Sequence, residues 1–272
     1  MLSRNFIAAG TFVVSASVFI QLSSRRKGQQ YASCANDGQI IGQVFPNSAT
    51  NIGTYSANDP CEDRNIFCDD SGFKIVGVFD GHGGWNVSEY ASKILIPNLL
   101  QKLKLSSLQK SLDDTSVDSD TISTFKEVEK SYIDSIREAY ELGYGGVASV
   151  GSCVCLAIRK DNRLTIANCG DCRAVLGSDI SQNADDGSSK SSAVSKYAAT
   201  RLSRDHNARI PLEVLNLQEQ HPNEEREDVV RCHKNQPTAC YVKGRLQLTR
   251  SLGDLYLKYE EFNAPPGQPR SM

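Results

Sequence analysis

The alternation of apolar and polar positions divides the chain into short apolar runs and longer amphipathic stretches. Residues 73–79 form an apolar run rich in β-branched and aromatic side chains, which predicts a buried strand. Apolar residues recur at helical spacing over residues 85–105 and 121–142, which predicts two helices. The next three β-rich runs are joined by short turns and predict an antiparallel meander; they cover residues 152–159, 164–168 and 172–176.

The remaining chain adds fewer regular elements. A strand is predicted around residues 40–45, a helix that begins with proline over 211–220, and a further strand over 244–249. Residues 178–195 are rich in Ser, Asp and Asn, which is typical of a surface loop. Because strands and helices come in separate blocks, the sequence predicts an α+β fold with helices laid over largely antiparallel sheets.

The N-terminus predicts a targeting or membrane-anchor segment over residues 1–30, ahead of one domain over residues 31–272. Residues 6–22 are uncharged and largely apolar, Arg4 precedes them, and a basic cluster follows at residues 25–27. Their length is marginal for a membrane-spanning helix, which needs about 20 residues. A mitochondrial targeting segment, a single membrane anchor with the domain facing the cytoplasm, and a buried core helix all remain open.

Composition narrows the classes of function. The chain is 39% hydrophobic and 23% charged, which is typical of a soluble globular protein. Its net charge is -2 and it has no basic stripe with interleaved aromatic residues, so we expect no nucleic-acid partner. The nine cysteines lie mostly in apolar runs, which predicts reduced, buried thiols. Residues Cys169 and Cys172 have C-x-x-C spacing, but no second pair completes a zinc site, so a tight turn is favoured there.

The candidate chemistry lies where predicted strands end. Asp80 follows the apolar run at 73–79, and a carboxylate in that place can bridge two hard cations. Gly81 has no Cβ, so its carbonyl oxygen can approach one of them, with His82 next along the chain. Glu62 and Asp63 precede another β-like run, and Asp254 follows a third such run at residues 248–253. We therefore expect these acidic side chains to meet.

In six ordered blocks the chain resembles the metal-dependent type 2C family of serine/threonine protein phosphatases, and within it most closely the pyruvate dehydrogenase phosphatase branch. The blocks follow the order and approximate spacing of that family between residues 56 and 258. They are residues 56–64, 78–84, 151–153, 167–174, 202–207 and 248–254.

The resemblance implies a sandwich of two antiparallel β-sheets flanked by α-helices, with two Mg²⁺ or Mn²⁺ ions at one end. By this likeness Asp80 bridges both ions, Glu62 and the Gly81 carbonyl serve one of them, Asp254 serves the other, and Asp63 supports the cluster. An activated water would then hydrolyse phosphoserine or phosphothreonine in a protein substrate. His82 would protonate the leaving oxygen as general acid.

Two departures from the family pattern bear on activity. Many members place arginine where this chain has Asn58; the pyruvate dehydrogenase branch also has asparagine there, so we interpret it as a branch marker. Arg64 lies nearby, but nothing in the sequence assigns it to the substrate phosphate. The family also has a downstream block of the Asp-Gly-Leu-Trp type with another metal-binding aspartate, which does not occur before Met272. We therefore expect a phosphatase domain that is incomplete at its C-terminus.

Three functions are compatible with these features. The first is a phosphatase acting on a phosphorylated protein, with a mitochondrial enzyme complex among the candidate partners and a mitochondrial location favoured. The second is a catalytically impaired member that binds phosphoproteins or regulates them. The third is a membrane-tethered scaffold with thiol chemistry, which rests only on the apolar N-terminus and the cysteines.

Overall fold

The computed structural model describes residues 5–7, 11–15, 30–32, 41–44, 51–54, 59–109, 114–179 and 197–264. Most of the predicted targeting segment over residues 1–30 therefore lies outside the described residues, as do Asn58 and residues 180–196. In the described part of the chain, no helix is long and apolar enough to span a bilayer. The targeting prediction stays a prediction.

Two hairpins form the centre of the main sheet. One pairs β6 (Arg64–Asp70) with β7 (Phe73–His82), and the other pairs β8 (Gly151–Lys160) with β9 (Arg163–Cys169). The seven-stranded sheet has the order β1-β9-β8-β7-β6-β3, and β14 pairs with the start of β8. The three outer strands are β1 (Asn5–Ile7), β3 (Gln30–Ala32) and β14 (Leu252–Gly253).

Side chains of β7 alternate between two hydrophobic cores because successive strand residues point to opposite faces. Phe73, Ile75 and Phe79 belong to one core, whereas Val76 and Val78 belong to the other. The sheet is therefore buried on both faces. This explains why the run over residues 73–79 is apolar throughout and does not alternate with polar residues.

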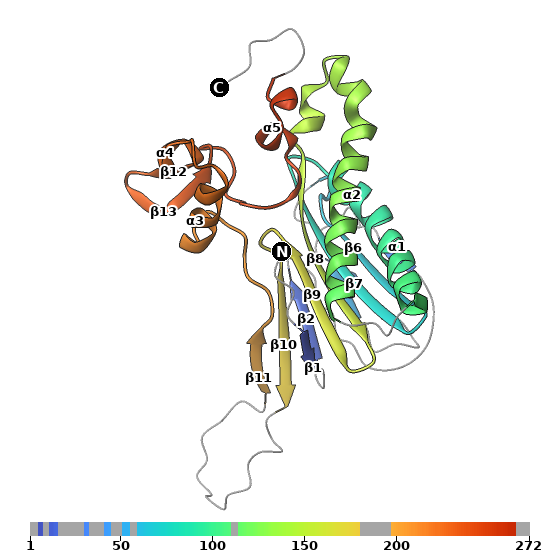
Figure 1. Cartoon of the computed structure of the whole chain (residues 1–272). Coiled ribbons are helices and arrows are strands. Elements are labelled where there is room, and N and C mark those ends of the chain that lie inside the picture. Colours follow the sequence, from blue (N-terminus) through green and yellow to red (C-terminus); the bar gives the residue numbers. More distant parts are fainter. Residues whose placement is uncertain are drawn as a thin grey trace, which may run out of the picture.

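Helices α1 (Asn86–Gln109) and α2 (Asp114–Glu141) pack on the first of these faces (Figure 1). Both overlap the helices predicted at residues 85–105 and 121–142. Leu95, Leu99 and Leu103 of α1 are fully buried there, and Phe125 and Val128 of α2 join them. Their spacing of three or four residues is the helical period that the sequence displayed.

The second face packs against a separate three-stranded sheet of order β11-β10-β2. It consists of β2 (Thr11–Ser15), β10 (Arg173–Asp179) and β11 (Tyr197–Arg201). The predicted meander is therefore wrong at its third strand, because β10 leaves the main sheet after the turn at Gly170 and pairs with β11 and β2. The antiparallel sandwich itself, and the α+β class, are confirmed.

A smaller unit follows, with its own core of Ala208, Val214, Val229, Val230 and Cys240. It contains α3 (Pro211–Gln220), as predicted, and also α4 (Arg226–Val229), β12 (Val230–His233) and β13 (Gln236–Val242). The strand predicted over residues 244–249 is wrong. Lys243 and Gly244 have positive φ angles and form a turn, so only isolated bridges occur at Leu246 and Leu248.

Short elements complete the described chain. The 3₁₀ helix η1 (Gly145–Ala148) precedes β8, and α5 (Leu255–Lys258) and η3 (Glu260–Phe262) follow β14. β4 (Ile41–Val44) and β5 (Asn51–Thr54) form a separate pair, and β4 agrees with the strand predicted around residues 40–45.

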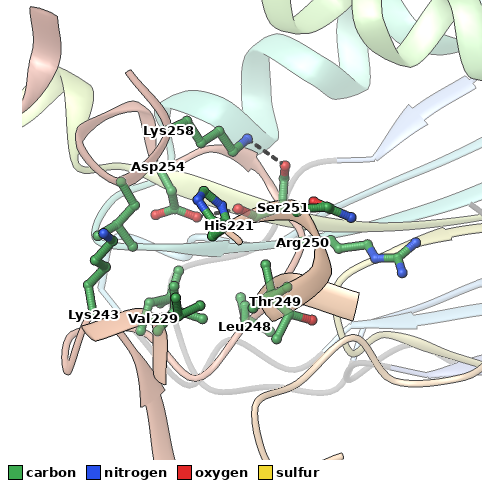
Figure 2. A pocket seen from close by; sticks show the side chains of 14 residues that line it. His221, Val229, Lys243, Leu248, Thr249, Arg250, Ser251, Asp254 and Lys258 are labelled. Carbon is green, nitrogen blue, oxygen red and sulfur yellow. Dashed lines mark hydrogen bonds between the residues drawn. The ribbon is translucent and has the colours of Figure 1, made fainter. Parts of the chain in front are cut away.

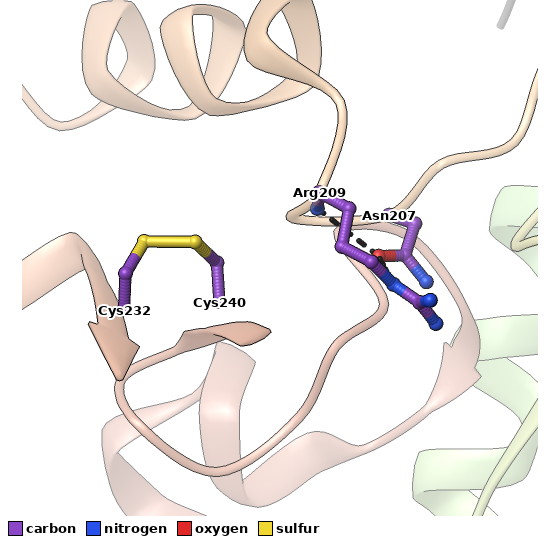
Figure 3. Close-up of a disulfide and its surroundings, with 4 residues drawn as sticks. All are labelled: Asn207, Arg209, Cys232 and Cys240. Carbon is purple, nitrogen blue, oxygen red and sulfur yellow. Dashed lines mark hydrogen bonds between the residues drawn. A yellow bond between two sulfur atoms is a disulfide. The ribbon is translucent and has the colours of Figure 1, made fainter. Parts of the chain in front are cut away.

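The cysteines are only partly reduced. Cys68, Cys153, Cys155, Cys169 and Cys172 are free thiols, as predicted. The prediction is wrong for Cys61, which is disulfide-bonded. It is also wrong for Cys232 and Cys240, which form a disulfide across the β12–β13 hairpin (Figure 3). These two residues are directly opposite each other in the strand register, with Cα atoms 4.0 Å apart, and this pairing was not visible in the sequence.

Candidate active site

The last three residues of β7 carry the centre of the candidate site. Asp80, Gly81 and His82 continue the strand beyond the predicted end at residue 79 and remain paired with β8. In this register Asp80 lies opposite Cys153 and His82 lies opposite Gly151. The three residues predicted to carry the chemistry therefore belong to a strand in the middle of the sheet.

Asp63 meets Asp80, as the sequence predicted, and the charge of Glu62 acts on both. β6 begins at Arg64, which pairs with Phe79, so the preceding acidic residues reach the end of β7. The Asp63 carboxyl accepts a hydrogen bond from the Gly81 backbone N–H and shares another with Asp80. A Cβ on Gly81 would overlap the carbonyl oxygen of Glu62. Glycine at this position therefore lets the acidic loop lie directly on the strand.

Burial and neighbouring charge disfavour the ionisation of Asp80 and Asp63. The pKa of Asp80 is raised to about 6. Burial is the largest cause, the charges of Asp63, Asp171 and Glu62 also raise it, and His82 lowers it. Burial and the charge of Glu62 also raise the pKa of Asp63. A cation that binds between like charges held together in this way relieves their repulsion.

Asp171 is a member of the cluster that the sequence reasoning missed. It lies in the turn between Cys169 and Cys172, where the tight turn itself was predicted correctly. Its Oδ2 accepts a hydrogen bond from Asn207 Nδ2 at 3.1 Å, and its Oδ1 lies 3.4 Å from the thiol of Cys153. The available signal was its place after the β-like run at residues 164–168, the same placement that marked Asp80.

Asp254 is brought to His82 and not to the middle of the acidic loop. His82 Nε2 lies 2.8 Å from Asp254 Oδ2, which also accepts a hydrogen bond from Ser251 Oγ. Asp254 is only 2% exposed, and its Oδ1 has no hydrogen-bond partner among the described residues. A buried carboxylate oxygen of this kind is available to a cation, a water or a substrate donor.

The surroundings of His82 favour its protonated form. Burial alone would lower the pKa of His82, but the hydrogen bond and charge of Asp254, with the charges of Asp80 and Glu62, outweigh burial and raise the pKa above its ordinary value. An imidazolium beside a carboxylate can donate a proton to a leaving group. The role of His82 as general acid stays a prediction.

The residues present fit a water-rich divalent cation better than a closed protein cage. Among the residues that the structure describes, no three His, Cys, Asp or Glu side chains converge closely enough to hold an ion by themselves. Mg²⁺ commonly keeps several waters and binds through one or two carboxylates. The raised pKa of Asp80, to which the charges of Asp63, Asp171 and Glu62 contribute after burial, and the carboxylate oxygens around it match that behaviour.

A pocket of about 280 Å³ opens beside Asp254 (Figure 2). Thr249, Ser251 and Lys258 line it from the segment around Asp254, and His221 and Val229 line it from the smaller unit. The pocket therefore lies between the smaller unit and Asp254, the residue whose carboxylate contacts His82.

Comparison with known proteins identifies the family. The family model described as "Protein phosphatase 2C" matches residues 54–270. The chain belongs to the protein phosphatase 2C family, which comprises serine/threonine phosphatases.

Individual relatives agree with this assignment. The chain is 31% identical over 220 residues to "Probable protein phosphatase 2C 68" of Arabidopsis thaliana, covering 80% of this chain and 50% of that protein. It is 33% identical over 215 residues to "Probable protein phosphatase 2C 78" of Oryza sativa subsp. japonica, covering 79% and 49%. The chain thus spans about half the length of the curated relatives it matches.

The fold is also shared with a solved structure, the serine-threonine phosphatase 2C from Toxoplasma gondii. The TM-score is 0.52 at 14% sequence identity, and the match covers 94% of this chain and 73% of the other. At that identity the comparison supports the fold alone.

Proposed function

We propose that the protein removes phosphate from phosphoserine or phosphothreonine in protein substrates and depends on Mg²⁺ or Mn²⁺. The observation that supports this most strongly is the half-buried group of carboxylates next to His82, which consists of Glu62, Asp63, Asp80 and Asp171. Such a cluster is unfavourable without a cation, and His82 is placed to act as a proton donor.

In this mechanism Asp80, Glu62 and the Gly81 carbonyl would hold the divalent cations, with Asp63 in support. The bound cations would supply a water of lowered pKa and neutralise phosphate charge. Asp254 keeps Nε2 of His82 oriented and favours its protonated form. His82 then delivers its proton to the departing serine or threonine oxygen. The role of Asp254 as a ligand of the second ion stays a prediction.

The test uses the full chain stripped of metal with EDTA and then supplied with Mn²⁺. We expect Mn²⁺-dependent release of phosphate from a phosphothreonine peptide and from p-nitrophenyl phosphate. Asp80→Asn should reduce both rates by on the order of 10³-fold or more, since it removes the central carboxylate. His82→Gln should reduce peptide turnover by about 10²- to 10⁴-fold but p-nitrophenyl phosphate turnover much less, because p-nitrophenolate leaves without a proton.

Asp69→Asn is the matched control, because Asp69 is paired with Lys74 at the opposite end of the same hairpin. Turnover unaffected by EDTA and by Asp80→Asn would contradict the proposal. Binding of a phosphopeptide without Mn²⁺-dependent turnover would instead support the second candidate, a phosphoprotein-binding member of the family.

The finer assignments are proposals that rest on the sequence. Asn58 supports the pyruvate dehydrogenase phosphatase branch and therefore a phosphorylated mitochondrial enzyme as substrate. The apolar stretch at residues 6–22 and the basic cluster after it support mitochondrial targeting or a single N-terminal anchor. Imaging of a tagged full-length chain, with carbonate extraction of the membranes, distinguishes the two.

A further inference from the structure

The loop that carries Glu62 and Asp63 is fixed at three successive carbonyl groups. Arg64 Nη1 donates hydrogen bonds to the carbonyl oxygens of Cys61 at 2.9 Å and Asp63 at 2.7 Å. Ser88 Oγ donates to the carbonyl oxygen of Glu62, which lies between them. The backbone of this acidic loop therefore has little freedom to move away from β7.

Both attachments depend on the first turn of α1. Ser88 belongs to that turn and is fully buried, and the adjacent Glu89 accepts a hydrogen bond from Arg64 Nε. The Arg64 side chain is 14% exposed, so Glu89 and the two carbonyl groups occupy its guanidinium. The arginine nearest to the acidic loop thus holds the backbone of that loop and is not directed to a substrate phosphate.

The attachment fixes Glu62 and Asp63, two neighbouring carboxylates of like charge, beside the end of β7. Like charges held close together repel, so an unattached loop would be free to move away from the strand. Held in place, they are already arranged for a cation, so binding requires less reorganisation.

We propose that Arg64, Ser88 and Glu89 form a clamp that positions Glu62 and Asp63 for divalent-cation binding. This inference rests on the proposed metal-dependent function. The three are positioning residues: they act through the loop backbone, in the way that residues behind metal ligands often set metal affinity.

The experiment measures Mn²⁺ binding to the full chain by the electron paramagnetic resonance signal of free Mn²⁺, which does not depend on catalysis. Ser88→Ala removes one attachment without changing charge, and Arg64→Lys keeps the charge but loses the paired donors. We expect each to weaken Mn²⁺ binding by on the order of ten-fold. The kcat at saturating Mn²⁺ should stay within about two-fold, because the filled site restores the loop.

Glu89→Gln should act in the same direction, and its effect should persist in about 0.5 M salt, where a long-range loss of negative charge is largely screened. Lys93→Gln is the control: Lys93 pairs with the other carboxylate oxygen of Glu89 at 2.5 Å but is 64% exposed and does not touch the loop. The Mn²⁺ affinity of Lys93→Gln should equal that of the wild type.

The outcomes separate the clamp from the function on which it rests. If the wild type binds Mn²⁺ and Arg64→Lys and Ser88→Ala bind it equally well, the clamp is wrong and the metal site stands. If the wild type binds no Mn²⁺, the proposed function fails and the clamp with it. Circular dichroism establishes that each variant is folded, and Arg64→Lys provides the test if Ser88→Ala is not.

Discussion

Gly151 lies where His82 and Asp254 meet, and because it has no side chain it leaves room for this pair. A Cβ at this position would overlap both His82 Nε2 and Asp254 Oδ2. Asp254 itself adopts a left-handed backbone conformation, with φ of 50°, while its N–H is bonded to the carbonyl oxygen of Val150 at 2.9 Å. The chain therefore accepts an uncommon aspartate conformation to bring this carboxylate across β8 to the histidine.

We predict that Gly151→Ala lowers kcat for a phosphothreonine peptide by about 10²-fold, because the added methyl group separates the His82–Asp254 pair. Mn²⁺ binding at the acidic loop should change little, since the atoms nearest to the added methyl group belong to Asp254 and His82 and not to Glu62 or Asp63. Steady-state kinetics and Mn²⁺ titration of the same preparation provide the measurement. Gly146→Ala is the control, because a Cβ there has nothing within 4 Å. Equal kinetics in the two variants would show that the pair tolerates the methyl group.

The chemistry-bearing acids could be predicted because each sits next to an apolar run. Glu62, Asp63 and Asp80 were recognisable from their places at strand ends, and the structure brings them together. Asp171 has the same placement, but the C-x-x-C spacing of the two cysteines around it is also typical of metal and redox motifs. Ser88 could not be predicted at all, because its role depends on a contact with a residue 26 positions earlier.

At the scale of elements, local periodicity predicted which segments are helices and strands but not which strands pair. β8 and β9 form the predicted hairpin, whereas β10 joins a second sheet whose other strands come from residues 11–15 and 197–201. Nothing within β10 specifies those partners. The same limit applies to Cys232 and Cys240, whose disulfide follows from the register of β12 against β13.

Helix α3 is attached to the segment that leads to Asp254 through one buried carboxylate. Glu213 is 3% exposed and accepts hydrogen bonds from Thr249 Oγ1 at 3.0 Å and from Arg250 Nε at 3.1 Å. The second guanidinium nitrogen, Nη2, lies 3.3 Å from its other oxygen. This pair joins the smaller unit to the wall of the pocket beside Asp254.

We predict that Glu213→Gln lowers the free energy of unfolding by about 1–3 kcal/mol, because it leaves Arg250 without its charged partner. The figure is at the lower end of that expected for buried pairs, since the Arg250 side chain is 30% exposed. Urea unfolding followed by circular dichroism measures the change. Glu219→Gln alters an exposed residue of the same helix and should be neutral. A similar, small effect of both substitutions would mean that the pair adds nothing to stability.

At the scale of the whole molecule, a nearly neutral chain concentrates negative charge at one end of its main sheet. The net charge is only -2, yet burial and the charges of Asp63, Asp171 and Glu62 together raise the pKa of Asp80. The hydrophobic cores on the two faces of the sheet offset the cost of this repulsion. Function and stability therefore place opposite demands on Asp80.

The effect of Asp80 on the stability of the fold can be measured, and its sign follows from the pKa of Asp80. That pKa is about 6 in the folded protein against an ordinary value of 3.8, so the folded state binds more protons between these values. Without metal, stability falls as the pH rises from about 4 to 6, and the loss persists above pH 6. We predict that Asp80→Asn stabilises the metal-free protein by about 1–3 kcal/mol at pH 7.5 and by much less near pH 4.

Mn²⁺ should reverse the order of stability of the wild type and Asp80→Asn. At a free concentration about 100 times its Kd, a ligand that binds only the folded state stabilises it by about 2.7 kcal/mol. Wild type should gain this stabilisation and Asp80→Asn should not, so the two melting curves exchange places between EDTA and Mn²⁺. Asp69→Asn should respond to Mn²⁺ like the wild type, because Asp69 lies at the other end of the hairpin and pairs with Lys74. If Asp80→Asn melts below the wild type in EDTA at pH 7.5, repulsion at Asp80 does not limit the stability of the fold.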